Sequence, residues 1–150
     1  MSWNNLEDIL NFAINNEIEA ADFYSDLANK VKNPNTQILF RDFAKEEMRH
    51  KKILENIKAG GNLRSATETV VDLKIGDYLV EVDQKDNLGY QDALILAMKR
   101  EKAAFMLYTD LANASGSAEL KEVFASLAQE EARHKLSFET EYDQHILGEN

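Results

Sequence analysis

Apolar side chains recur along the chain at alternating steps of three and four residues, which is the spacing of one face of an α-helix. In the first such stretch the stripe consists of Leu6, Leu10, Ala13, Glu17, Ala20, Tyr24, Leu27 and Val31. Three later stretches repeat the pattern. Together they predict helices over roughly residues 4–31, 34–59, 89–114 and 118–146. We therefore expect four helices that each bury one face.

Helix-breaking residues separate these stretches and set the topology. Pro34 is well placed at a helix start, Gly60 follows the second stretch, and Gly116 separates the third from the fourth. The connector, about 60–88, is much longer than the two hairpin turns, and its middle, VVDLKIGDYL, can hold a short helix. Two hairpins joined by one long crossover predict an all-α four-helix bundle, with residues 1–150 as a single domain.

A short motif occurs twice in the chain. EEMRH at residues 46–50 returns as EEARH at residues 130–134, which is 84 residues later (134 minus 50). With this shift, residues 6–56 align without a gap on residues 90–140. The match indicates a duplicated helical hairpin. The two predicted hairpins cover about 4–59 and 89–146.

Carboxylates and imidazoles interrupt the apolar stripes at one level. Glu-x-x-His occurs in the second and fourth predicted helices, and its i, i+3 spacing places both side chains on one helix face. One Glu interrupts each of the other two stripes. The six residues are Glu17, Glu47, His50, Glu101, Glu131 and His134. Buried, ionised carboxylates are costly without a partner, and no Lys or Arg lies in these stripes, so surface salt bridges are a poor explanation and a bound cation is expected.

The donor set limits which cation this is. Two divalent metal ions would balance four carboxylates, and neutral histidines would complete the shell of each ion. Oxygen and nitrogen donors without sulfur suit iron or manganese, and zinc can occupy such a site adventitiously. The chain has no cysteine, which excludes thiolate metal sites, disulfides and cysteine nucleophiles.

The net charge of −10 narrows the class of partner. It disfavours nucleic acid, anionic membranes and other polyanions. The N-terminus, MSWNNLEDIL, is polar and acidic, unlike a signal peptide. No apolar run approaches the roughly 20 residues that span a bilayer. These features predict a cytoplasmic protein that binds neither nucleic acid nor membrane.

One Glu from each of two helices, with Glu-x-x-His from each of the other two, is the ligand pattern of ferritin-like di-iron carboxylate proteins. Nearly the whole chain resembles the di-iron domain of rubrerythrins, which implies a ferritin-like four-helix bundle with two iron ions per chain. The implied roles are terminal ligand for Glu17 and Glu101, bridging ligand for Glu47 and Glu131, and a ligand to one metal each for His50 and His134.

Two departures from the rubrerythrin pattern affect what the resemblance implies. Rubrerythrins usually carry a C-terminal rubredoxin domain with four cysteines, and this chain has no cysteine. They also carry an extra Glu three residues after the ligand of the third helix, where this chain has Ala104. Ala20 holds the equivalent place in the first repeat. We therefore expect two matching half-sites.

Further residues near the predicted ligands are candidates for supporting roles. In related di-iron proteins an acid at the place of Glu46 and Glu130 orients the histidine of the opposite motif, while the alternative is a surface ion pair. Tyr24 and Tyr108 either hydrogen-bond ligand carboxylates or simply fill the core. His145 lies outside the motifs and is predicted to be solvated.

The rubrerythrin resemblance implies reduction of hydrogen peroxide or O₂ to water. With no cysteine of its own, the chain would need a separate electron-donor protein such as a rubredoxin, and we expect a homodimer. Two alternatives stay open. A ferroxidase or iron-storage protein would use the same site, although 150 residues without a fifth helix argue against a ferritin shell. A non-catalytic metal-binding module is the other.

Overall fold

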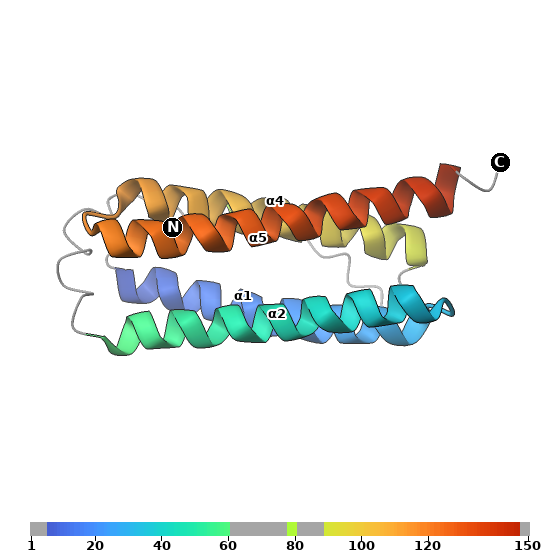
Figure 1. The fold of residues 1–150 in the computed structure, drawn as a ribbon, viewed down its shortest axis with the longest axis horizontal. Coiled ribbons are helices and arrows are strands. Elements are labelled where there is room, and N and C mark those ends of the chain that lie inside the picture. Colours follow the sequence, from blue (N-terminus) through green and yellow to red (C-terminus); the bar gives the residue numbers. More distant parts are fainter. Residues whose placement is uncertain (1–5, 61–77, 81–88, 148–150) are drawn as a thin grey trace. The chain divides into compact units, whose positions relative to one another are not determined.

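The computed structural model describes residues 6–60, 78–80 and 89–147, without the side chains of residues 146 and 147. Within these residues the regular structure is helical. The elements are α1 (Leu6–Lys30), α2 (Pro34–Ala59), α4 (Tyr90–Ala114), α5 (Ala118–Tyr142) and a π-helical turn, η2 (Asp143–Leu147) (Figure 1). They form two compact units, one around α1 and α2 and the other around α4 and α5.

The observed helix bounds agree with the predicted ones to within one residue wherever both fall inside the described residues, except at one place. The last helix was predicted to continue to residue 146, but α5 ends at Tyr142 and the chain continues as the wider turn η2. The short helix predicted in VVDLKIGDYL falls largely on residues 70–77, which lie outside the described residues.

Asn33 and Pro34 determine where α2 begins. The side-chain oxygen of Asn33 accepts hydrogen bonds from the backbone N–H groups of Asn35, at 2.9 Å, and Thr36, at 3.3 Å. These donors have no partner inside the helix, so the cap satisfies them. Pro34 stands in the first turn, where its missing N–H costs nothing.

Aromatic side chains join α1 to α2 within the first hairpin. Tyr24 of α1 is fully buried and meets Phe43 of α2 edge to face, with ring centroids 6.4 Å apart. Phe40 lies one turn before Phe43, at 6.5 Å. Such pairs add to the stabilisation from apolar burial. They fix the two helices side by side in a defined register.

A polar and aromatic cluster joins the two ends of the second hairpin. The Tyr90 hydroxyl donates to the Glu141 carboxylate at 2.7 Å, and the Gln91 amide donates to the Tyr142 hydroxyl at 3.3 Å. His145 of η2 packs edge-on against the Tyr90 ring at 4.7 Å and is only partly exposed. The prediction of a solvated His145 is therefore wrong, because the turn after α5 brings it back onto the start of α4.

The connector contacts the second hairpin through Tyr78. This residue is buried, and its hydroxyl donates to the Asp110 carboxylate of α4 at 2.7 Å. Asp26 occupies the equivalent position of the first repeat and is exposed. The duplicated aspartates therefore have different surroundings in the two hairpins.

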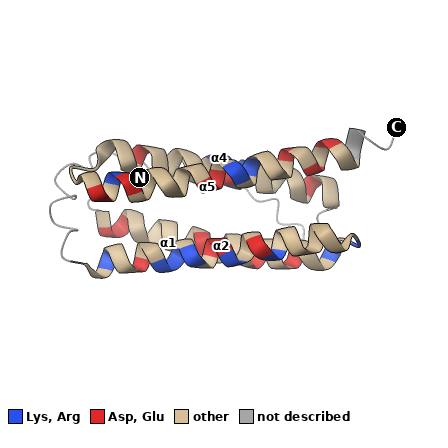
Figure 2. Ribbon diagram, viewed as in Figure 1, with Lys and Arg blue, Asp and Glu red and all other residues tan. Residues whose placement is uncertain are grey.

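The apolar stripes form the core as the spacing predicts. In α1 every stripe residue is buried, and Val31, which directly follows the helix, is partly exposed. Charged residues are spread along all four helices (Figure 2). No helix among the described residues is both long and apolar enough to cross a bilayer.

Candidate metal centre

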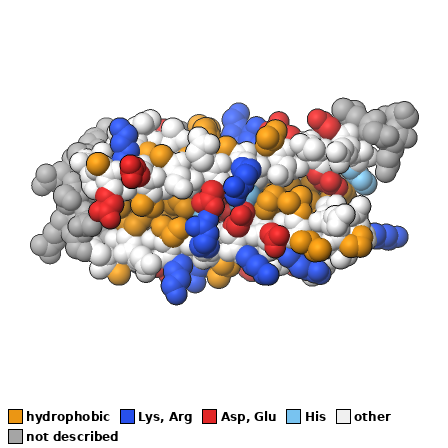
Figure 3. Space-filling model, in the orientation of Figure 1, with side chains coloured by type: hydrophobic (Ala, Val, Ile, Leu, Met, Phe, Trp, Pro, Cys, Tyr) orange, Lys and Arg blue, Asp and Glu red, His pale blue; other side chains and the backbone are white. Residues whose placement is uncertain are grey.

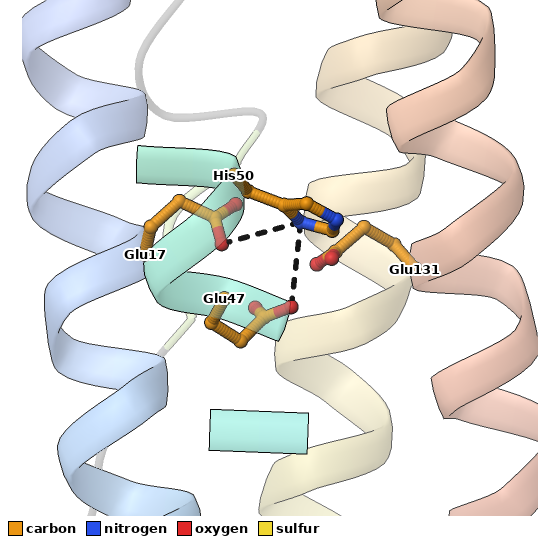
Figure 4. A group of neighbouring side chains, drawn as sticks. All are labelled: Glu17, Glu47, His50 and Glu131. Atoms are coloured by element: carbon orange, nitrogen blue, oxygen red, sulfur yellow. Dashed lines mark ion pairs between the residues drawn. The ribbon is translucent and has the colours of Figure 1, made fainter. Parts of the chain in front are cut away.

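The first hairpin brings Glu17, Glu47 and His50 together in its interior. Nδ1 of His50 lies 3.6 Å from Oε2 of Glu17 and 3.5 Å from Oε1 of Glu47. The three side chains are 2%, 1% and 0% exposed. Figure 4 shows the carboxylates of Glu17 and Glu47 turned toward the His50 ring, with dashed lines along the two short separations. We call these three residues the first half-site.

The second hairpin repeats this arrangement with Glu101, Glu131 and His134, which we call the second half-site. Nδ1 of His134 lies 3.6 Å from Oε2 of Glu101 and 3.9 Å from Oε1 of Glu131. The side chains are 1%, 1% and 0% exposed. The duplication seen in the sequence therefore extends to the geometry of the side chains.

Helix geometry explains why each half-site forms. Glu47 and His50 are three residues apart on α2, so both project from the same face of that helix. Glu17 comes from the buried stripe of α1, against which α2 packs. A rigid two-helix scaffold thus holds all three donors. The same reasoning applies to α4 and α5 in the second half-site.

The separations between donor atoms suit a shared ion better than direct hydrogen bonds. At 3.5–3.9 Å they exceed the roughly 2.7–3.2 Å of an N–H···O bond. Two atoms bound to one metal at about 2.0–2.2 Å lie roughly 3.0–3.6 Å apart. In each half-site the three candidate ligand atoms all lie within 4.8 Å of one another. Small side-chain adjustments would bring them into contact with a metal ion.

The charge of the half-sites also points to a cation. Among the described residues, the buried polar and charged side chains are the six of the two half-sites, and no Lys or Arg is buried. Four buried carboxylates are costly if they are ionised, unless positive charge lies close by. A divalent metal ion supplies that charge, and His supplies a neutral nitrogen ligand. The donor set therefore fits iron or manganese.

The structure thus confirms that the six predicted residues are buried and that each repeat gathers three of them. Their role as ligands remains a prediction. Glu46 and Glu130 are partly exposed, and Glu130 lies 3.9 Å from Arg133, three residues on in the same helix. This contact agrees with the alternative that Glu130 forms an ion pair on the surface, although a separation of 3.9 Å is long for a strong ion pair. Both readings of Glu46 and Glu130 stay open.

Tyr24 and Tyr108 are both buried, as either of their proposed roles requires. The contact between Tyr24 and Phe43 shows that Tyr24 does fill the core of its hairpin. A hydrogen bond from either hydroxyl to a ligand carboxylate remains a prediction.

The reasoning from sequence missed the cluster of Tyr90, Glu141 and His145. In the sequence Tyr90 stands at the start of the apolar stripe of the third predicted helix, at the position of Leu6 in the first repeat. The change from Leu to Tyr between repeats was the available signal. A partly buried tyrosine hydroxyl benefits from a polar partner, and Glu141 near the end of α5 supplies one.

The chain is similar to known proteins in sequence and in fold. The family model for rubrerythrin matches residues 8–142. No curated protein matched the sequence.

Two solved structures are similar to the chain. One, from Thermotoga maritima, is described as a ferritin-like diiron-carboxylate protein; it is 20% identical, with a TM-score of 0.81 over 95% of this chain and 97% of that chain. The other is a hypothetical protein from Pyrococcus furiosus, 27% identical, with a TM-score of 0.72 over 93% of this chain and 89% of that chain. The first likeness confirms the predicted ferritin-like fold, and because the family match covers most of its length, the chain belongs to the rubrerythrin family.

Proposed function

We propose that this protein binds two iron ions and reduces hydrogen peroxide to water with electrons from a separate donor protein. The observation that carries the proposal is the pair of buried half-sites, each with two carboxylates and one imidazole and with no buried Lys or Arg among the described residues. Membership of the rubrerythrin family and the description of the Thermotoga relative support iron as the metal.

The two half-sites together would hold the metal pair. Glu17 and Glu101 would each bind one ion, Glu47 and Glu131 would bridge the pair, and His50 and His134 would each complete one shell. Six protein ligands leave coordination positions free for a small oxidant. Manganese would suit the same donors, and zinc could replace iron during purification.

The overall reaction is H₂O₂ + 2 H⁺ + 2 e⁻ → 2 H₂O. Bound iron would supply the two electrons, one from each ion. The chain itself would contribute a buried, rigid site: Glu17 and Glu47 would hold their charge close to the metal, and His50, which is 0% exposed, would keep bulk water away from its side of the site. Buried and fixed ligands need little reorganisation during the reaction, which lowers its barrier.

The donor would be a second protein, because a chain without cysteine cannot hold a rubredoxin iron. A rubredoxin or a carrier of similar chemistry fits this role. We further propose a homodimer. If the purified protein reduced peroxide at a catalytic rate with a pyridine nucleotide alone, the proposed dependence on a separate donor would be wrong.

Peroxide turnover by the iron-loaded protein tests the proposal. The wild type, with a chemical reductant, should consume peroxide catalytically, and Glu47→Gln should lose at least about 99% of that rate because it removes a charged ligand. Glu55→Gln is the matched control, since Glu55 lies on the same helix, is 49% exposed and pairs only loosely with Lys51 at 3.8 Å. Equal rates for Glu47→Gln and the wild type would overturn the proposed site.

Peroxide consumption and oxidation of added Fe²⁺ by O₂, both measured on the same protein, separate the alternatives. A ferroxidase would oxidise added Fe²⁺ with O₂ and show no preference for peroxide. A non-catalytic binding module would hold iron without turnover. Either outcome would contradict the peroxidase proposal and leave the metal site intact.

A further inference from the structure

The outward face of α2 is basic, although the chain as a whole carries a net charge of −10. At 3.6 residues per turn, six exposed residues fall within roughly a third of the circumference of the helix. We call them the basic face of α2: Ile38, Arg41, Lys45, Met48, Arg49 and Lys52. Figures 2 and 3 show basic residues along α2 and basic side chains standing out from the surface of its hairpin.

The composition of this face is unusual in two ways. Four of its residues are basic, and an exposed acid lies beside each edge of the face, Asp42 on one side and Glu55 on the other. It also exposes two large apolar side chains, Ile38 at 56% and Met48 at 44%. Methionine and arginine are both enriched at protein interfaces, so this mixture of side chains fits an interaction surface.

The second repeat shows that the hairpin fold does not require this face. The equivalent positions on α5, 84 residues later, are Glu122, Ala125, Gln129, Ala132, Arg133 and Leu136. The metal-site positions of α2 and α5 match, but of the six outward positions only Arg49 has an identical counterpart, Arg133. The basic character of α2 is therefore not required by the hairpin fold or by the repeated ligand motif.

The basic face lies directly behind the first half-site. Met48 and Arg49 stand between Glu47 and His50 in the sequence, so one helix carries surface and ligand residues in the same turn. The diameter of a helix with its side chains is about 10–12 Å. A partner docked on this face would therefore lie close to the proposed metal site.

We propose that the basic face of α2 docks a small acidic electron-carrier protein, which reduces the metal site through this helix. The inference rests on the proposed function and deepens it by naming the surface and the charge of the donor. Two one-electron carriers would be oxidised for each peroxide reduced. Because the chain as a whole is strongly acidic, most of its surface would repel an acidic carrier, whereas the basic face of α2 would attract it. This difference would orient the carrier as it approaches.

Reduction of the iron-loaded protein by a reduced acidic rubredoxin tests the proposal. The variant Arg41→Ala/Lys45→Gln converts two positions to the residues of the second repeat. At low ionic strength its second-order rate constant for reduction should fall about tenfold, and added salt should narrow the difference. Lys30→Gln/Lys58→Gln is the control, because it removes the same charge from exposed residues outside the basic face and should behave as the wild type does.

Equal rates for the two double variants would overturn the docking surface. Reduction by dithionite should be the same for both, since they carry the same net charge; a loss confined to Arg41→Ala/Lys45→Gln would mean a damaged metal site and would count against the proposal. Binding of oxidised rubredoxin, measured by titration calorimetry, should weaken only in the Arg41→Ala/Lys45→Gln variant. If that difference holds but the reduced protein leaves peroxide unchanged, the proposed peroxidase activity fails and the docking surface stands.

Discussion

At the scale of single residues, six side chains interrupt the otherwise apolar stripes of the helices, and all six are buried in the structure. An acid inside a buried stripe is costly, and that cost makes Glu17 and Glu101 conspicuous. The structure places both at no more than 2% exposure. Glu46 and Glu130 carry no such signal, because a partly exposed acid beside an arginine is equally at home on a surface. Their role therefore could not be predicted from the sequence.

Bridging and terminal ligands should respond differently to substitution. We expect Glu47→Gln or Glu131→Gln to lower the occupancy of both metal ions, because each of these carboxylates is proposed to bridge the pair. His50→Ala or His134→Ala should chiefly weaken one ion. Metal content after dialysis against a mild chelator, measured per folded chain, distinguishes these outcomes. A Glu47→Gln variant that keeps one ion at full occupancy would argue against a bridge.

Ala104 predicts a nearly symmetric site. In rubrerythrins an extra Glu at this position binds one iron in the oxidised state, and that iron moves to a histidine on reduction. Here residues 102–105 are Lys-Ala-Ala-Phe, which offer no acid, and Ala20 matches Ala104 in the first repeat. We expect His50 and His134 to stay bound in both oxidation states. Crystal structures of the oxidised and reduced protein check this, and a shift of one iron by more than about 1 Å, half of a roughly 2 Å metal–ligand bond, would contradict it.

At the scale of elements, helix ends could be predicted where the chain marks them chemically. Asn33 and Pro34 specify the start of α2, and both signals are local. The end of α5 was predicted too far along the chain, because the π-helical turn η2 depends on contacts with residues far away in the sequence. His145 reaches Tyr90 across the hairpin, and a helical period alone does not encode such a contact.

The Tyr90–Glu141 hydrogen bond predicts a pH dependence at alkaline pH. Burial, and then the hydrogen bond and negative charge of Glu141, raise the pKa of Tyr90 above its usual range. The folded protein thus keeps this proton while the unfolded chain releases it near pH 10. The stabilisation is therefore complete below about pH 10 and is lost as the pH rises above it.

Denaturant unfolding of Tyr90→Phe between about pH 8 and 11 checks this prediction. At pH 8 the variant should be less stable by about 0.5–1.5 kcal/mol, the usual net value of one hydrogen bond. Its stability should fall less steeply toward pH 11 than that of the wild type. Tyr142→Phe, whose contact with Gln91 is 3.3 Å long, is the control and should cost less at pH 8. Parallel slopes for Tyr90→Phe and the wild type would contradict the assignment.

At the scale of the whole molecule, the duplicated hairpin, the ferritin-like fold and the rubrerythrin family could all be predicted from one sequence. A gapless internal match and four apolar stripes together leave few alternative architectures. The basic face of α2 could not be found in this way, because charges on an exposed helix face are common. The structure adds the observation that its six residues are all exposed.

Metal removal should destabilise the molecule as a whole. A ligand that binds only the folded state stabilises it by about 4 kcal/mol when present at 1,000 times its dissociation constant. For a chain of this length that corresponds to a rise in Tm of roughly 10 °C. Calorimetry of the iron-loaded and metal-free proteins at pH 7 checks the expected difference. Equal melting temperatures would mean that the half-sites do not depend on a metal ion.

The most direct test of the central claim is the metal content of the wild-type protein after anaerobic purification and loading with iron. Two buried half-sites of matching composition predict two tightly bound iron ions per chain, measured by elemental analysis against protein concentration from quantitative amino-acid analysis. A value close to two after removal of loosely bound metal supports a dinuclear centre. A value of one or less would contradict it, and the peroxidase mechanism that depends on a metal pair would then be wrong.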